Sequence, residues 1–309
     1  MEGAETDLRV SELAKGIKKG NRIALAKGIT LAENDPAAAS KLLAPLGPPG
    51  RAFVVGITGP PGTGKSSLVD RLIEAYRKDG LKVGVIAVDP SSPITGGALL
   101  GDRIRMADHA GDREVFIRSM ASRGWSGGLS RATSQVIRLM DAAGYDLILL
   151  ETVGIGQSDI EVVGVSHAVL VVLMPGLGDD IQVSKAGLME IGDIYVVNKS
   201  DLEGADLLVV SLLSLFRGSP RSPPVLKASA LSGEGIDKLH DAIEGMRASF
   251  AAGDSGLRLK SIRGMIVETA RGAAMERLAT VSEAKAGRLA AQVMAGKTTI
   301  EAAAASLSS

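Results

Sequence analysis

The chain has 309 residues, 45% of them hydrophobic, which is enough for one large domain with appendages or for two domains. Its 35 basic and 35 acidic side chains cancel and only 3% of residues are aromatic, so we expect neither a general electrostatic grip on nucleic acid or anionic membrane nor a stacking platform for single strands. The absence of cysteine excludes disulfides, thiolate metal sites and cysteine nucleophiles.

Residues 1–50 are predicted to form an N-terminal helical segment. They lack the apolar core of a signal peptide, so we expect a cytoplasmic location. An apolar stripe over 10–17 predicts a first helix, which Gly20-Asn21 ends, and Asp35-Pro36 is typical of a cap followed by proline at the first helical position. We expect these helices to cover the neighbouring domain, with a dedicated partner surface as the alternative. Residues 47–50, Gly-Pro-Pro-Gly, indicate a hinge.

Residues 51–255 are predicted to form the main domain, because short apolar runs alternate there with helical patterns. This alternation predicts an α/β fold with a mostly parallel sheet flanked by helices. The run 168–174 is too short to span a bilayer and indicates a central strand. The predicted strands are 52–57, 82–88, 114–118, 146–151, 168–174, 193–197 and 224–228, and the predicted helices include 66–79, 128–143, 201–217 and 234–250.

A glycine-rich loop follows the first predicted strand. It matches the pattern of Gly, four residues, then Gly-Lys-Ser, in the strand–loop–helix context that this motif requires. Its backbone N–H groups and the helix N-terminus suit the β- and γ-phosphates, Lys65 adds a point charge, and Ser66 offers a hydroxyl to Mg²⁺. The sequence therefore predicts a phosphate-loop NTPase fold. The expected nucleotide-binding residues here are Gly59, Pro60, Pro61, Gly62, Thr63, Gly64, Lys65, Ser66 and Ser67.

A second motif follows a later strand and indicates the base. Asn198, Lys199 and Asp201 resemble the Asn-Lys-x-Asp element of GTP-binding proteins. A carboxylate at this position can accept from both N1–H and the 2-amino group of guanine, whereas adenine lacks this donor pair. Such a mismatch can cost on the order of 10⁴-fold, so we expect GTP and GDP rather than ATP. The segment Ser229-Ala230-Leu231 resembles the loop whose backbone N–H meets guanine O6 in these proteins.

Three further loops follow predicted strands. In the loop 89–103, Asp89 and Asp102 are candidate Mg²⁺ ligands or water-positioning acids, with helix capping as the alternative. In the loop 151–158, Glu151 suits a role behind a Mg²⁺ ligand, and Gly154 can donate its N–H to a γ-phosphate. The loop 175–182 is acidic and carries no prediction alone.

The C-terminal part is predicted to be an arm of helices. Residues 251–256 indicate a linker, and 258–305 have a helical, alanine-rich pattern with a break near Gly287 or Gly296. Helices that leave a finished α/β domain cannot bury their apolar faces alone. We therefore expect residues 256–309 to form a dimerisation arm, with packing back on the main domain as the alternative.

Taken together, the loop from Asp89 to Arg103, the segment 151–158 and Asn198-Lys199-Ser200-Asp201 resemble the MeaB/ArgK family of GTPases. The resemblance implies a homodimer joined through C-terminal helices, a GTPase domain at 51–255, and GTP hydrolysis to GDP and phosphate. It also implies a chaperone-like role beside an adenosylcobalamin-dependent methylmalonyl-CoA mutase or a related acyl-CoA mutase, gating cofactor loading and protecting or reactivating the enzyme. By resemblance, Ser66, Asp89, Asp102 and Glu151 surround Mg²⁺, and Lys65, Asp89, Glu151 and Gly154 carry the hydrolysis.

One departure bears on the rate of hydrolysis. In Ras-type GTPases a glutamine directly after the glycine of the second switch orients the attacking water, whereas here that position is Ile155 and Gln157 lies two residues further on. We therefore expect slow hydrolysis by the isolated protein. Two rival functions are a GTPase for metal-centre assembly, which the absence of cysteine and the scattered His109, His167 and His240 disfavour, and a transport-linked kinase.

Overall fold

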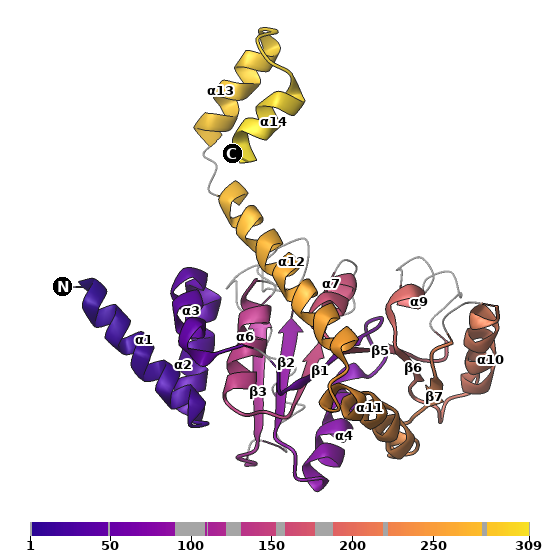
Figure 1. Cartoon of the computed structure of the whole chain (residues 1–309). Coiled ribbons are helices and arrows are strands. Elements are labelled where there is room, and N and C mark those ends of the chain that lie inside the picture. Colours follow the sequence, from indigo (N-terminus) through magenta and orange to yellow (C-terminus); the bar gives the residue numbers. More distant parts are fainter. Residues whose placement is uncertain are drawn as a thin grey trace.

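The computed structural model describes residues 2–48, 50–89, 109, 111–121, 131–152, 158–176, 188–218, 222–279 and 283–308. In these ranges the strands form a 7-stranded sheet in the order β3-β2-β4-β1-β5-β6-β7, and every neighbouring pair is parallel (Figure 1). The strands are β1 (Phe53–Thr58), β2 (Val83–Asp89), β3 (Val115–Ala121), β4 (Leu147–Glu151), β5 (Ala168–Leu173), β6 (Ile194–Val197) and β7 (Val225–Lys227). The predicted α/β fold is confirmed, with a strand in each predicted position.

The central strands are buried on both faces, because a parallel sheet with crossover helices has helices on each side. Along β1, Val54 points into one core and its neighbours Phe53 and Val55 into the other. One core is covered by α4 (Lys65–Lys78) and α11 (Ile236–Ala251). The other is covered by α6 (Arg131–Ala142), α7 (Ser158–Val165), α9 (Leu188–Ile191) and α10 (Ala205–Phe216). Helix α10 begins four residues later than the predicted helix 201–217. Residues 201–204 instead form turns that end at Gly204, which has φ 90°.

The N-terminal helices form a further layer over α6. They are α1 (Glu2–Lys18), α2 (Arg22–Asn34), α3 (Pro36–Leu43) and the short 3₁₀ helix η1 (Ala44–Leu46). Asp35 caps α3 by accepting from two backbone N–H groups, as the sequence predicts, and Asn21, predicted only to end the first helix, caps α2 in the same way. Leu25 and Ile29 of α2 are buried in the same core cluster as Leu139 of α6. The prediction of a helical layer covering the domain is confirmed.

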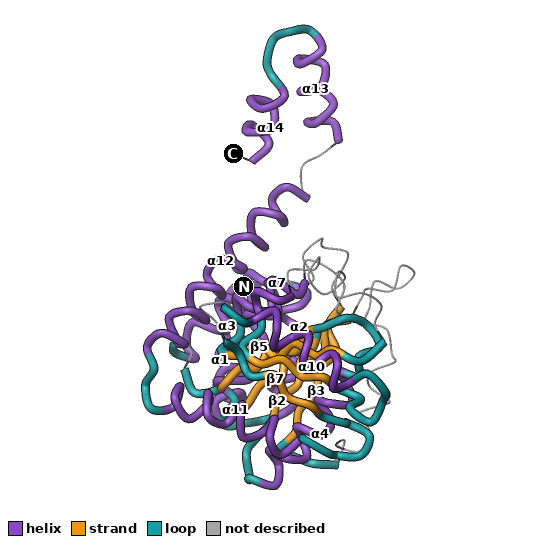
Figure 2. Tube along the Cα trace, turned by 90° about the vertical axis from the view of Figure 1, so that its right-hand side faces the viewer, coloured by secondary structure: helices purple, strands orange, loops and turns teal. Residues whose placement is uncertain are grey.

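The C-terminal helices are α12 (Ser255–Ala279), α13 (Glu283–Met294) and α14 (Ile300–Ser308). The predicted linker 251–256 is wrong in extent, since α11 runs to Ala251 and α12 begins at Ser255. Gly296, with φ 65°, lies in the turn between α13 and α14, whereas Gly287 lies inside α13. Figures 1 and 2 show α12 leaving the domain, with α13 and α14 side by side beyond it.

The first half of α12 packs on α7 through two facing glycines. A Cβ atom added to Gly264 would lie 1.5 Å from the carbonyl oxygen of Gly164, so the two helix backbones touch. Beside this contact Met265 is buried, and buried Ser261 donates its hydroxyl to the carbonyl of Val165 at 3.3 Å. Packing on the parent domain therefore applies to this half of α12. Within the described part of the chain, none of the helices has the length and apolar character needed to cross a bilayer.

Candidate functional site: a nucleotide site at the carboxyl ends of the strands

The glycine-rich loop joins β1 to α4 in the middle of the sheet, where β1 lies between β4 and β5. Two of its glycines leave no room for a side chain. A Cβ on Gly59 would lie 2.0 Å from the carbonyl oxygen of Val172, and a Cβ on Gly64 would lie 2.5 Å from Asn198 Nδ2. Gly64 also has φ 85°, which side chains rarely tolerate. The loop therefore needs glycine both for its shape and for its close approach to neighbouring strands.

Lys65 begins α4 and its ammonium group folds over the loop. Its Nζ donates to the carbonyl oxygens of Gly59 at 2.8 Å and Pro60 at 3.0 Å, and the side chain is buried. The Thr63 hydroxyl also donates to Pro60, at 3.0 Å. These contacts hold a positive charge beside the backbone N–H groups of a helix N-terminus, an arrangement that suits a polyphosphate.

Ser66 and Glu151 meet at the carboxyl end of the sheet. The hydroxyl of Ser66 donates to Glu151 Oε1 at 2.6 Å, and both side chains are buried. Glu151 ends β4 in register with Ile57 of β1, so two neighbouring strands place this pair beside the phosphate loop. A hydroxyl and a carboxylate are oxygen ligands of the kind that Mg²⁺ accepts, so the pair fits that ion.

The other predicted Mg²⁺ and catalytic residues are only partly placed. Asp89 is the last residue of β2, and its backbone is in register with Ala121 of β3. Strand β2 lies next to β4, on the side away from β1. Asp102 and Gly154 lie outside the described residues, as do Ile155 and Gln157. Their roles in metal binding and hydrolysis remain predictions.

Asn198 follows β6 and connects the phosphate loop to the predicted base loop. Its Nδ2 donates to the carbonyl oxygen of Thr63 at 2.8 Å, and its Oδ1 accepts from the backbone N–H of Ala230 at 3.1 Å. The side chain is 1% exposed. Lys199 follows with φ 54°, the one non-glycine residue at positive φ in the part of the chain that the structure describes. This bend turns the chain between Asn198 and Asp201.

Asp201 and Ser229 form the second contact of the base motif. The Ser229 hydroxyl donates to Asp201 Oδ1 at 2.6 Å, and this hydrogen bond lowers the pKa of the Asp201 carboxyl below its ordinary value. The backbone N–H of Ser200 also donates to the carbonyl of Ala228 at 3.0 Å, which ties the two segments together. The structure thus brings Asp201 and the 229–231 loop together, with the carboxylate ionised at neutral pH.

Arg71 is a residue of this region that the sequence pattern did not single out. It lies on α4, and its guanidinium donates to the carbonyl oxygens of Ala230 at 2.8 Å and Leu231 at 3.2 Å. A single arginine on an amphipathic helix resembles any solvent-facing charge, so no signal in the local sequence distinguishes it.

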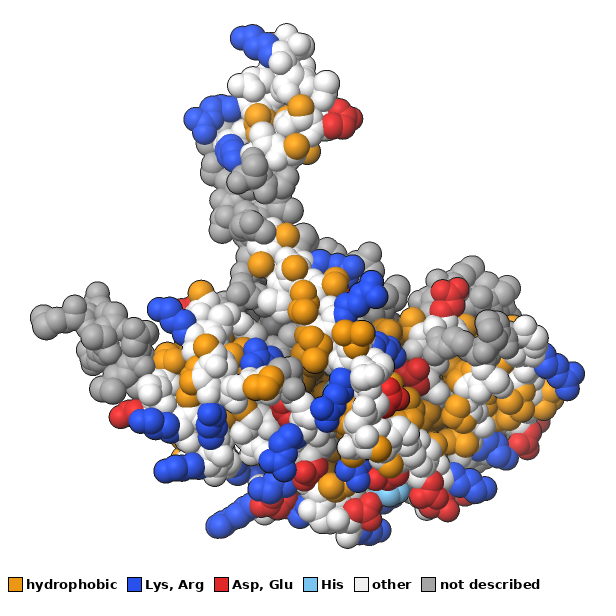
Figure 3. Space-filling model, in the orientation of Figure 1, with side chains coloured by type: hydrophobic (Ala, Val, Ile, Leu, Met, Phe, Trp, Pro, Cys, Tyr) orange, Lys and Arg blue, Asp and Glu red, His pale blue; other side chains and the backbone are white. Residues whose placement is uncertain are grey.

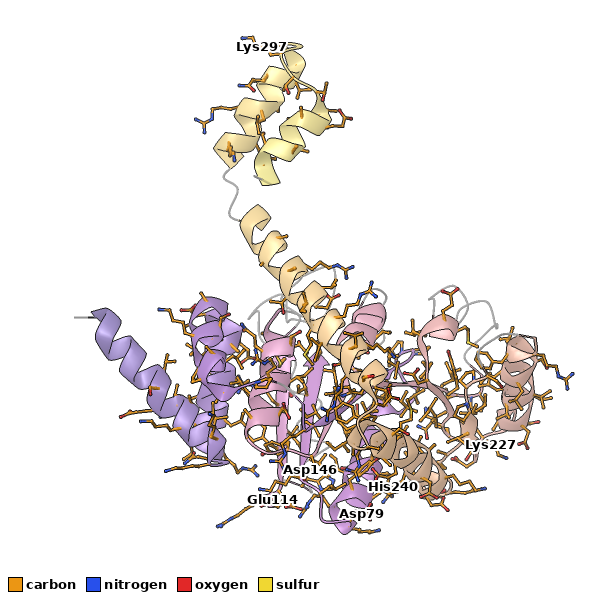
Figure 4. The ribbon with its side chains drawn as sticks, in the orientation of Figure 1. Asp79, Glu114, Asp146, Lys227, His240 and Lys297 are labelled. Atoms are coloured by element: carbon orange, nitrogen blue, oxygen red, sulfur yellow. The ribbon has the colours of Figure 1, made fainter. Side chains whose placement is uncertain are left out.

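The three histidines lie apart from one another. His167 is buried, its Nδ1 accepts from the backbone N–H of Val54 at 2.9 Å, and burial, with Lys260 and Arg258 nearby, lowers its pKa to about 4. His109 Nε2 lies 3.0 Å from Asp70, and His240 Nε2 lies 2.8 Å from Asp79. Figure 4 shows Asp79 and His240 together at the end of the domain away from the phosphate loop. Among the described side chains, no group of three or more His, Cys, Asp or Glu residues could hold a metal ion.

The chain is similar to several known proteins that are named as GTPases. A putative GTPase of Pyrococcus horikoshii is 51% identical over 243 residues, which are 76% of this chain and 77% of that protein. GTPase ArgK of Escherichia coli is 38% identical over 267 residues, 82% of this chain and 80% of that protein. The mouse protein named "Methylmalonic aciduria type A homolog, mitochondrial" is 36% identical over 260 residues, 76% of this chain and 62% of that protein.

A solved structure and a family profile complete the comparison. The crystal structure titled "LAO/AO transport system kinase" superposes with a TM-score of 0.71 at 27% identity, covering 97% of this chain and 96% of that one. The profile described as "Methylmalonyl Co-A mutase-associated GTPase MeaB" matches residues 25–286. The chain is therefore a guanine-nucleotide-binding GTPase, and it belongs to the MeaB family of methylmalonyl-CoA mutase-associated GTPases.

Proposed function

We propose that this GTPase assists an adenosylcobalamin-dependent acyl-CoA mutase of the methylmalonyl-CoA type. It gates loading of the cofactor and protects or reactivates the mutase. The observation that carries the proposal is the match of residues 25–286 to a family described by its association with that mutase. The name of the mouse relative, which refers to methylmalonic aciduria, supports the same class of acyl group.

In this proposal the site described above binds the phosphates and the base of the nucleotide. Lys65 places its charge on the β- and γ-phosphate oxygens, and Gly154 donates its N–H to the γ-phosphate. Ser66, Asp89, Asp102 and Glu151 hold Mg²⁺, which neutralises charge on the phosphates when it is bound. On the base side, Asn198 and Lys199 shape the pocket, Asp201 accepts from guanine, and the 229–231 loop offers a backbone N–H to O6.

The C-terminal helices supply the proposed homodimer contact. Leu259, Ile266 and Val267 of α12 are 69%, 65% and 44% exposed, and Met294 and Ile300 in the α13–α14 pair are 90% and 70% exposed. Figure 3 shows hydrophobic side chains along the exposed side of α12. Exposed apolar surface of this extent is typical of an interface. Removal of residues 255–309 takes away α12, α13 and α14 with all five of these side chains, and we expect it to convert dimers to monomers in light scattering.

The mutase role is tested by following the activity of the purified mutase during turnover. We expect the mutase to lose activity more slowly with this protein and GTP than with this protein and GDP. A Lys65→Ala variant, which loses the charge over the phosphate loop, is the matched control and should give no GTP-dependent protection. Equal inactivation in all three reactions, with no complex between the two proteins, would overturn the proposal and leave the GTPase assignment intact.

A transport-linked kinase is the second candidate, because the solved structure at TM-score 0.71 carries that title. Such an activity predicts transfer of the γ-phosphate of GTP to a solute-binding protein of a basic amino-acid transport system. Labelled γ-phosphate distinguishes the two functions, since our proposal predicts release of free phosphate only.

We further propose that the protein works in the cytoplasm, where its nucleotide and the mutase would meet, without contacting nucleic acid or a membrane.

A further inference from the structure

Arg71 links the helix that begins at the phosphate loop to the loop proposed to contact the base. The guanidinium Nε donates to the carbonyl oxygen of Ala230 at 2.8 Å, and Nη2 donates to that of Leu231 at 3.2 Å. The remaining nitrogen, Nη1, pairs with Glu74 one turn along α4 at 3.1 Å. The two ends of the guanidinium thus have different partners, one in the base loop and one on its own helix.

The contact with Ala230 fixes the orientation of one particular N–H group. A trans peptide is planar, and its C=O and N–H point in opposite directions. The carbonyl of Ala230 and the N–H of Leu231 belong to the same peptide, so Arg71 on the carbonyl side directs the Leu231 N–H away from α4. A cationic donor on the carbonyl also makes this peptide N–H a stronger donor.

The preceding peptide of the loop is fixed separately. The N–H of Ala230 donates to Asn198 Oδ1 at 3.1 Å, and the carbonyl of Ser229 accepts from the N–H of Gly233 at 2.8 Å. Since the Ala230 N–H already has this partner, the Leu231 N–H is the donor that Arg71 leaves for a ligand.

We propose that Arg71 is a positioning residue for base selection: it holds the Leu231 N–H as the donor to the 6-oxo group of guanine nucleotides. The inference rests on the proposed base-binding role of the 229–231 loop and adds the residue that makes the loop selective. Asp201, which Ser229 holds in place, accepts from the 2-amino group. The 2-amino group and the 6-oxo group of the purine therefore bind to an acceptor and a donor that different residues position.

This separation makes nucleotide analogues suitable probes. We would measure the dissociation constants of GDP, of inosine diphosphate, which lacks the 2-amino group, and of 2-aminopurine riboside diphosphate, which lacks the 6-oxo group and the N1 proton. The missing N1–H weakens the Asp201 contact equally in the wild type and the variant, so it cancels when their preferences are compared. In Arg71→Met the preference for GDP over the 2-aminopurine nucleotide should fall about tenfold, the usual weight of a charge-assisted hydrogen bond. The preference for GDP over inosine diphosphate should stay unchanged.

Two further variants separate this role from a structural one. Glu74→Gln removes the helix ion pair and keeps both carbonyl contacts, so it should leave both preferences as in the wild type. Arg71→Lys keeps a cation that reaches one carbonyl and should restore part of the 6-oxo preference; if Arg71→Met does not fold, this variant decides. An equal loss of affinity for all three nucleotides, or none, in the folded Arg71 variant overturns the inference. No preference of the wild type for GDP over the 2-aminopurine nucleotide would instead contradict the proposed roles of both the base loop and Asp201.

Discussion

Asn198 Nδ2 donates to the carbonyl oxygen of Thr63 at 2.8 Å, so a residue of the base motif supports the phosphate loop directly. Because the same side chain also accepts from Ala230, Asn198→Ala removes two buried hydrogen bonds at once. We expect GDP affinity to fall by about 10- to 100-fold and the melting temperature to fall as well, since the Thr63 carbonyl loses its partner. Calorimetric titration with GDP measures the first effect. Ser200→Ala is the matched control, because the buried Ser200 hydroxyl has no hydrogen-bond partner among the described residues, and it should bind GDP normally.

Substitution of Asp201 by asparagine tests the choice of base. The carboxylate accepts from two donors of guanine, whereas an amide has an NH2 donor group beside its acceptor oxygen, which suits the 2-oxo group of xanthine. We expect Asp201→Asn to weaken GDP binding at least about 100-fold and to strengthen xanthosine diphosphate binding. Competition between the two nucleotides measures the exchange, and an unchanged order of affinity would remove Asp201 from the base site.

The pair formed by Ser66 and Glu151 predicts how hydrolysis depends on Mg²⁺. Glu151→Gln keeps an oxygen for the Ser66 hydroxyl but removes the negative charge beside it. We expect the Mg²⁺ concentration for half-maximal GTP hydrolysis to rise about tenfold or more, the usual effect of altering a residue that supports a metal ligand. Glu114→Gln is the control, because Glu114 lies at the opposite end of the domain (Figure 4) and pairs with Lys82 at 3.0 Å. Equal Mg²⁺ requirements in the two variants would contradict the proposed metal site.

His167 predicts a loss of stability at acidic pH. Burial lowers its pKa from 6.5 to about 4, so between these values the unfolded chain binds a proton that the folded protein does not. Stability is therefore fully present above pH 6.5 and falls as the pH drops toward 4, by about 3 kcal/mol at most. Asn in place of His167 keeps an acceptor for the Val54 N–H and cannot titrate. Its urea unfolding should show a smaller loss of stability between pH 7 and pH 4.5 than the wild type, and an identical loss would contradict this assignment.

The sequence predicts the elements of this fold well because their signals are local. Apolar runs such as 146–151 and 168–174 correspond to β4 and β5, and the residues that end them lie at the carboxyl edge, as Glu151 does. The contact of Ser66 with Glu151 follows from two motifs whose strands are neighbours. The predicted linker 251–256 was too long because its small and polar residues also suit a helix start, and only the packing of α12 on α7 distinguishes the two.

Contacts without a local signal were not predictable. Arg71 reaches Ala230, more than 150 positions along the chain, and Gly264 faces Gly164 across two helices. Nothing in the neighbouring sequence of either residue specifies its partner, because both contacts depend on how separate elements meet in space. The facing glycines also show why a glycine inside a helical pattern need not mark its end.

The meeting of Gly164 and Gly264 makes α12 a lever with its pivot on α7. With about 1.5 Å of rise per residue, the helix from Gly264 to Ala279 extends about 22 Å beyond the pivot, so a rotation of about 10° there displaces its tip by about 4 Å. Any rotation of α7 would therefore be magnified at the far end of α12.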